Sequence, residues 1–300
     1  MALNVTSNYA GKAAGFYISQ ALRSANSMEY LTMIENIKFK SNIQKMNAAS
    51  MVQDATCDVN LAGTLTMTEA ILEPKNLMVQ SDLCKQTLLS SWEALQMRAG
   101  AGAPPPPSFE DYVISYMGEI IANATEESIW TGDNTNGQFL GFNSAAGLLL
   151  PGVDATVIQD AASAAYSATN IIANLQTAVA AIPVAVMRKE DLHIYMSPTT
   201  YSFYIQAVST LGYVNAYNMN GDYVPVFNGY KIAVCPGMID NQVNIAEKSN
   251  LFFGTDLLSD ATRINLLDMS TLDGSDNIRL VARYSAAVQS GVGSDIVRQS

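Results

Sequence analysis

The sequence predicts an α+β fold, and three features of the chain support this prediction. Residues 250–289 contain two extended apolar segments on either side of a polar turn, in which Gly274 is free to take a positive φ. Residues 109–130 carry apolar side chains at i, i+3 and i+4 spacing, which is typical of a long amphipathic helix. Between residues 167 and 234, strands and helices mix without strict β-α-β alternation, which favours α+β over a parallel α/β sheet.

The composition indicates that other subunits cover much of the surface. Of the 300 residues, 49% are hydrophobic and only 14% are charged, whereas soluble proteins carry roughly 25% charged residues. Extensive protein interfaces are depleted in charge, so contacts between copies of the chain would explain the deficit. A membrane would also explain it, but the chain has no run of about 18 apolar residues without charge. We therefore expect self-association and no membrane contact.

The net charge and the cysteines exclude two further classes. The formal net charge is −11, so the chain cannot gain affinity for nucleic acid by neutralising phosphates. The densest basic cluster, Lys38, Lys40 and Lys45, lies on an expected strand, where lysines commonly block stray edge pairing. Three widely spaced cysteines form neither a disulfide framework nor a zinc motif, and no signal peptide is apparent, so free thiols and synthesis in a reducing compartment are expected.

The first 80 residues predict segments that do not fold by themselves. Residues 1–35 are polar and weakly helical, with a short helix expected around residues 16–22. Residues 36–80 predict a long two-stranded arm, in which Ile37, Phe39 and Ile43 point one way and Leu65 and Met67 alternate with threonines. An isolated hairpin is marginally stable in water, so the arm is expected to lie on a neighbouring subunit.

The middle of the chain predicts two helices and a loop. Residues 81–97 predict a short amphipathic helix, and four prolines at 104–107 form a spacer before the long helix, which is expected to start with Ser108 as its N-cap. Ile120 is expected on the buried stripe of that helix, between Tyr116 and Ala124. The loop 137–142 is rich in glycine, but it lacks the Lys-Ser/Thr pair of a phosphate-binding loop.

Local signals also define the elements between residues 167 and 234. A helix is expected over residues 167–181, ended by Pro183, and a strand over Leu192–Met196. Ser197 followed by Pro198 predicts the start of a further helix. Residues 227–234 predict a hairpin turn at Asn228-Gly229 followed by a strand.

The residues that could carry catalysis or bind metals are few and isolated. His193 is the only histidine, and no Gly-x-Ser-x-Gly motif or reactive-cysteine context accompanies it. Asp273 and Asp276 could bind calcium, but their spacing is not that of an EF-hand. The sequence does not exclude a pair of carboxylates acting in glycoside hydrolysis, although it suggests no aromatic-rich cleft for a sugar. We expect no catalytic residue, no metal site and no cofactor, and hence no enzyme.

The order of these elements resembles that of tailed-bacteriophage major capsid proteins with the Hong Kong 97-type capsid fold. The resemblance is carried by the strand that leads into FFGTDL, the long hairpin into AAVQSG, the segment TGDNTNGQFLGF and the strand-helix pattern IYMSPTTYSFY. It implies an N-terminal arm at 1–35 and an extended two-stranded loop at 36–80. It further implies a peripheral domain at 81–165 with a spine helix at 109–130, an axial domain at 166–247, and a return to the peripheral domain at 248–300.

The resemblance also implies a function. The chain would be a major capsid protein whose hexamers and pentamers close into an icosahedral or prolate shell around double-stranded DNA, without sequence-specific DNA contact. Its partners would be other copies of itself, a portal protein, and scaffolding or decoration proteins; it would be made in the cytoplasm of a host bacterium and would reside in the virion capsid. The residues expected at contacts between subunits are Phe39, Leu65, Met67, Phe139 and Phe142.

Two alternatives remain at this point. An encapsulin-like compartment shell would share the fold but enclose enzyme cargo. The other alternative is a soluble enzyme or a filament subunit such as a flagellin. The β-rich C-terminus disfavours a flagellin.

Overall fold

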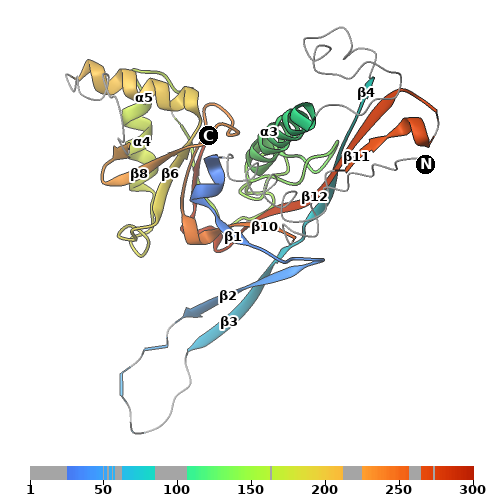
Figure 1. The fold of residues 1–300 in the computed structure, drawn as a ribbon. Helices are drawn as coiled ribbons and strands as arrows, with labels where there is room; N and C mark the ends of the chain where they lie inside the picture. Colours follow the sequence, from blue (N-terminus) through green and yellow to red (C-terminus); the bar gives the residue numbers. More distant parts are fainter. Residues whose placement is uncertain are drawn as a thin grey trace.

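The chain forms two sheets with helices and a projecting hairpin (Figure 1). The structure is a computed structural model. It describes residues 26–49, 51–52, 54–55, 57, 63–84, 107–162, 164–211, 225–256, 265–272 and 274–300. Within these residues the fold mixes helices and strands as expected. No helix in this part of the chain is long and apolar enough to cross a membrane.

The long strand β12 organises the first sheet. One edge of β12 pairs antiparallel with β11 and then with β10, and the other edge pairs antiparallel with β4. A further strand, β1, pairs parallel with β10. The expected C-terminal hairpin is therefore confirmed, and Gly274 has a φ of 75°. The strands are β1 (Thr32–Ile34), β4 (Lys75–Cys84), β10 (Leu251–Thr255), β11 (Asn265–Asp268) and β12 (Asn277–Ser290).

The helix α3 (Pro107–Thr131) packs on this sheet and matches the long helix expected from the sequence. Its core contacts come from Met117, Ile121 and Ile129, which cluster with side chains of β10 and β12. The expectation for Ile120 is wrong, because 38% of its surface is exposed while Ile121 is buried. The helix also begins at Pro107, so Ser108 lies in its first turn and not at the N-cap.

The second sheet has strand order β5-β13-β9-β6-β8-β7 and is covered on one face by two helices, α4 (Ile171–Ala180) and α5 (Pro198–Thr210). The helix start at Ser197 is confirmed, since its Oγ accepts a hydrogen bond from the Thr200 N–H at 3.2 Å. The turn between β7 and β8 has positive φ at Asn228 and Gly229, as a two-residue hairpin requires. The strands are β5 (Ile158–Asp160), β6 (Leu192–Met196), β7 (Val226–Phe227), β8 (Tyr230–Val234), β9 (Val243–Glu247) and β13 (Val297–Gln299).

The hairpin formed by β2 (Ser41–Ala49) and β3 (Thr64–Leu72) extends away from both sheets (Figure 1). It is shorter than expected, because the chain turns after Leu72 and residues from Lys75 onward enter the first sheet as β4. Pro74 lies between the two strands, where its missing N–H interrupts no ladder. Residues 81–84 are therefore strand and not helix, and the rest of the helix expected at 81–97 lies outside the described residues.

The end of the expected N-terminal arm is part of the folded body of the chain. The short 3-10 helix η1 (Asn26–Tyr30) and β1 pack into the fold, whereas the helix expected around residues 16–22 lies outside the described residues. Cys57 and Cys235 are free thiols, as expected. The side chain of Cys84 and the residue Asp273 lie outside the described part.

Candidate assembly surfaces

One face of the hairpin is apolar and exposed. The antiparallel register places Met46 opposite Met67, Ala48 opposite Leu65, and Asn42 opposite Ile71. Directly opposed residues of an antiparallel pair project on the same side, so these side chains share one face. The four large apolar side chains of this set are between 50% and 64% exposed. We call Met46, Leu65, Met67 and Ile71 the hairpin stripe.

The opposite face of the hairpin is buried only at its base. Leu72 and Ile37 pack with Ala287 of β12 in a small core of their own. The side chains of Leu72 and Ile37 lie directly over Gly254, where an added Cβ would be 2.6 Å from Leu72 Cδ2. The glycine in the FFGTD segment thus allows the base of the hairpin to pack on the first sheet. Gln289 strengthens the junction by donating from Nε2 to the Ile71 carbonyl at 3.0 Å.

Lys75 joins the base of the hairpin to the loop that follows α3. Its Nζ donates to the carbonyl oxygens of Asn134 at 2.6 Å and Gln138 at 3.0 Å. Within that loop, Asp133 accepts from the backbone and the hydroxyl of Thr135, and these bonds hold the pKa of Asp133 below its usual value. The loop, the helix and the hairpin base are therefore fixed relative to one another.

The five residues expected at subunit contacts fall into two groups. Leu65 and Met67 lie on the hairpin stripe, and Phe39 is exposed just before β2. Phe139 and Phe142 are almost completely buried in the core of the chain's own fold, so the expectation for this pair is wrong. Phe139 packs against Phe253 with ring centroids 6.3 Å apart, and Phe142 against Trp130 at 5.5 Å.

Sequence reasoning missed Met46 and Ile71 as members of the stripe. Only the strand register shows that Met46 lies across from Met67, because the two strands are separated by a long connection. The alternation of residues 64–68 identified one strand of the stripe but not its partner.

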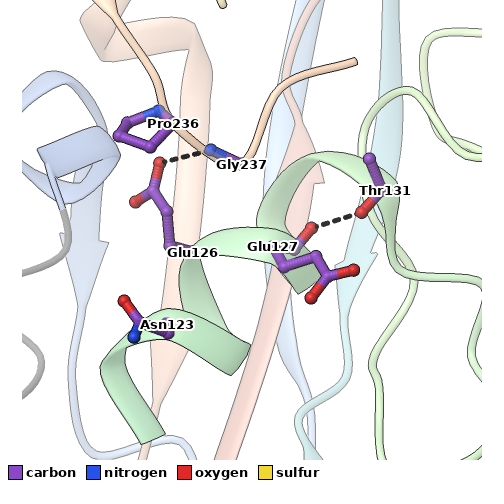
Figure 2. A pocket seen from close by; sticks show the side chains of 6 residues that line it. All are labelled: Asn123, Glu126, Glu127, Thr131, Pro236 and Gly237. Atoms are coloured by element: carbon purple, nitrogen blue, oxygen red, sulfur yellow. Dashed lines mark hydrogen bonds between the residues drawn. The ribbon is translucent and has the colours of Figure 1, made fainter. Parts of the chain in front are cut away.

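A hollow of about 380 Å³ lies beside α3 and is lined by Asn123, Glu126, Glu127, Thr131, Pro236 and Gly237 (Figure 2). The carboxylate of Glu126 already accepts hydrogen bonds from other groups of the same chain. It accepts from Ser27 N at 3.0 Å, from Ser27 Oγ, and from Gly237 N at 3.3 Å. A Cβ at Gly237 would lie 2.1 Å from the Glu126 carbonyl oxygen, so the helix and the 236–237 loop are in close contact.

These contacts make Glu126 a structural residue that joins η1, α3 and the loop after β8. The same Ser27 hydroxyl accepts from Trp130 Nε1 at 2.7 Å, so the side chains of Ser27, Glu126 and Trp130 form one buried network. None of the six residues lining the hollow is a histidine, cysteine or lysine. The hydroxyl and carboxylate groups in its lining belong to Thr131, Glu126 and Glu127, and the carboxylate of Glu126 already accepts hydrogen bonds from Ser27 and Gly237.

His193 is a core residue of β6. Its Nδ1 lies 2.7 Å from the Asp191 carbonyl, and its ring lies 5.4 Å from that of Tyr30 and 6.2 Å from that of Tyr195. Burial lowers its pKa below the usual value, so it is neutral at pH 7. Among the described residues no group of three histidine, cysteine, aspartate or glutamate side chains could hold a metal ion.

Comparison with models of protein families gave no match, and comparison with curated protein sequences gave none either. Solved structures do match. The capsid of an empty GTA particle is 12% identical, with a TM-score of 0.64 over 92% of this chain and 89% of that chain. The capsid of cyanophage A-1(L) is 14% identical, with a TM-score of 0.62 over 92% of both chains. The capsid of Myoviridae phage XM1 is 13% identical, with a TM-score of 0.56 over 91% and 90%.

At these identities the likeness concerns the fold alone, but it extends over about nine tenths of each chain. The match therefore extends over nearly the whole chain, whose described elements are the hairpin, the long helix and the two sheets. The chain therefore has the fold of bacteriophage capsid proteins.

Proposed function

We propose that the chain is the major capsid protein of a tailed bacteriophage and assembles with copies of itself into a closed shell. The observation that carries the proposal is the hairpin stripe. Its four large apolar side chains lie on a hairpin that extends away from the body and are at least half exposed. Burying such side chains on a second copy would gain roughly 25 cal/mol per Å² of apolar surface, and each copy repeats the contact around the shell.

The finer architecture belongs to the same proposal. The hairpin β2–β3 would be the extended loop, α3 the spine helix, the first sheet the peripheral domain, and the second sheet with α4 and α5 the axial domain. Hexamers and pentamers would form an icosahedral or prolate shell around double-stranded DNA. The net charge of −11 suits a wall that repels phosphate instead of binding it.

Portal, scaffolding or decoration proteins would be further partners, with assembly in the cytoplasm of a host bacterium and a final place in the virion. We prefer the phage capsid to an encapsulin-like compartment because the structures compared above are capsids of phages and of a GTA particle, although a compartment shell would share this fold. The content of purified particles separates the two, since DNA is expected inside a virion and a protein cargo inside a compartment.

The test uses two substitutions one residue apart on β3. Met67→Asp places a charge on the hairpin stripe, whereas Thr68→Asp places the same charge on the other, also exposed, face. Both sites are exposed in the subunit, so both variants are expected to keep the circular dichroism spectrum and the melting temperature of dissociated parent subunits.

Assembly is then measured by light scattering and negative-stain electron microscopy. We expect closed particles from the parent chain and from Thr68→Asp, and few or none from Met67→Asp, because an aspartate buried against a neighbour would be an unpaired charge. Normal particles from Met67→Asp would refute the role of the stripe. A parent chain that remains monomeric or dimeric at all salt and protein concentrations would refute the capsid function itself.

A further inference from the structure

Two members of the hairpin stripe are methionines. Met46 and Met67 lie directly opposite one another in the antiparallel register, and 64% and 59% of their surfaces are exposed, more than for Leu65 and Ile71. Directly opposed side chains project on the same side of a hairpin, so the two thioethers lie next to each other on the solvent-facing side. Leucine would supply the same apolar contact, whereas methionine adds a sulfur atom that can be oxidised.

The fold itself separates the methionines that an oxidant can reach from those that it cannot. Five methionines of the described core are at most 8% exposed: Met28, Met117, Met196, Met238 and Met269. Outside the stripe, three further described methionines are exposed: Met33, Met51 and Met78. Oxidation of a thioether follows its access to the oxidant, so a peroxide in solution reaches the stripe and not the core.

Oxidation would change the chemistry of the stripe. A lone pair of the sulfur attacks one oxygen of hydrogen peroxide, the O–O bond breaks, an S–O bond forms, and the second oxygen leaves as water after proton transfer. The sulfur is oxidised to a polar sulfoxide and the peroxide is reduced. In the free chain water solvates the new oxygen. Buried on a second copy, that oxygen needs a hydrogen-bond donor, which Ala48 and Leu65, the adjoining pair on the same face, do not carry in their side chains.

We propose that Met46 and Met67 are a modification site through which peroxides regulate self-association. A peroxide converts both side chains to sulfoxides in the unassembled chain, and the oxidised stripe no longer docks on a second copy. Reduction of the sulfoxides restores docking. Once a second copy covers the stripe, the same two residues are protected from the oxidant. The inference rests on the proposed function, because it assigns the regulation of the same stripe.

The test starts from dissociated chains that are treated with hydrogen peroxide, quenched, and analysed by peptide mass spectrometry and light scattering. All chains carry Cys57→Ser, because the exposed Cys57 thiol would also react. Oxidation of Met46 and Met67 should raise the chain concentration needed for particle formation about tenfold or more, as expected for burying an unpaired polar group. The melting temperature of dissociated chains should change by less than about 2 °C, because both sites are exposed. Methionine sulfoxide reductases specific for the two epimers should restore assembly.

Two double variants assign the effect to the stripe. Met46→Leu with Met67→Leu keeps an apolar stripe of similar volume without its sulfur atoms, so it should assemble equally well before and after peroxide treatment. The matched control, Met33→Leu with Met78→Leu, removes two exposed sulfur atoms outside the stripe and should lose assembly after treatment as the parent chain does. If peroxide blocks the first variant as strongly as the parent chain, the inference is overturned.

A footprint on the parent chain needs no methionine variant. In particles, Met46 and Met67 should oxidise several-fold more slowly than in dissociated chains, while the buried Met117 stays unreactive in both and reports an intact fold. Equal rates at Met46 and Met67 would overturn both this inference and the proposed role of the stripe. Normal particle formation by fully oxidised parent chains would overturn the inference alone. Untreated parent chains that never form particles would overturn the proposed function, and the inference with it.

Discussion

Removing the Ser27 hydroxyl should destabilise the subunit far more than a typical serine substitution. In Ser27→Ala the buried Trp130 Nε1 loses its acceptor at 2.7 Å, and the carboxylate of Glu126 loses one of its donors. Leaving a buried donor without a partner costs about 1–3 kcal/mol, and a hydrogen bond to a charged group contributes about 1.5–3 kcal/mol. Because the two losses share one hydroxyl, we expect a combined effect of roughly 3–5 kcal/mol on the free energy of unfolding.

The assay is urea and thermal unfolding of dissociated subunits, followed by far-ultraviolet circular dichroism. At about 2–4 °C per kcal/mol for a chain of this size class, the melting temperature should fall by roughly 6–20 °C. The matched control is Ser202→Ala on α5, an exposed serine whose hydroxyl bonds only to the Thr199 carbonyl at 2.8 Å. Its effect should stay within about 0.5 kcal/mol.

A double-mutant cycle with Trp130→Phe isolates the network. Phenylalanine removes the indole N–H, so in the Ser27→Ala background it should relieve part of the loss and give a coupling energy of about 1 kcal/mol or more. A destabilisation below about 1 kcal/mol for Ser27→Ala, or strictly additive effects in the cycle, would refute the idea that this hydroxyl anchors η1 to α3.

Two other predictions concern the helix face and the histidine. Ile121→Ala should destabilise dissociated subunits by about 2–5 kcal/mol and Ile120→Ala by less than about 1 kcal/mol, because only Ile121 leaves a cavity; equal effects in urea unfolding would show that the helix face is misplaced. The pKa of His193 is lowered by burial, so the unfolded chain takes up this proton at a higher pH than the native chain, and native stability should fall as pH drops below about 6.5 toward the lowered value. His193→Phe should show a smaller loss between pH 7.5 and 5.5 than the parent chain, and an equal loss would assign the effect to other groups.

Short-range signals allowed much of the fold to be predicted from the sequence. Ser197 followed by Pro198 fixes the start of α5, and Asn228-Gly229 fixes the turn between β7 and β8, because a cap or a tight turn depends on residues within a few positions. The C-terminal hairpin around Gly274 and the long helix after the prolines were identified for the same reason.

Which side chains are buried depends on contacts with residues that are distant in the sequence. The helix period could not show that Ile121 and not Ile120 meets the sheet, since the apolar spacing between residues 109 and 124 includes both of them. In the sequence, an aromatic residue that contacts a neighbouring chain cannot be distinguished from one that fills the core. Only the tertiary contacts of Phe139 with Phe253 and of Phe142 with Trp130 show that both are core residues.

The hairpin stripe, too, could be predicted from the sequence only in part. The alternation of Leu65 and Met67 was visible in the sequence, because the strand period is two residues. The hairpin stripe as a whole was not, since Met46 joins Met67 only through the register of two strands with a long connection between them. The same holds for β4, whose residues from Lys75 onward leave the hairpin and pair with β12, about 200 positions later in the chain. Composition and local pattern determined which elements form, and tertiary structure decided which faces are buried, because burial depends on contacts that no short window of sequence contains.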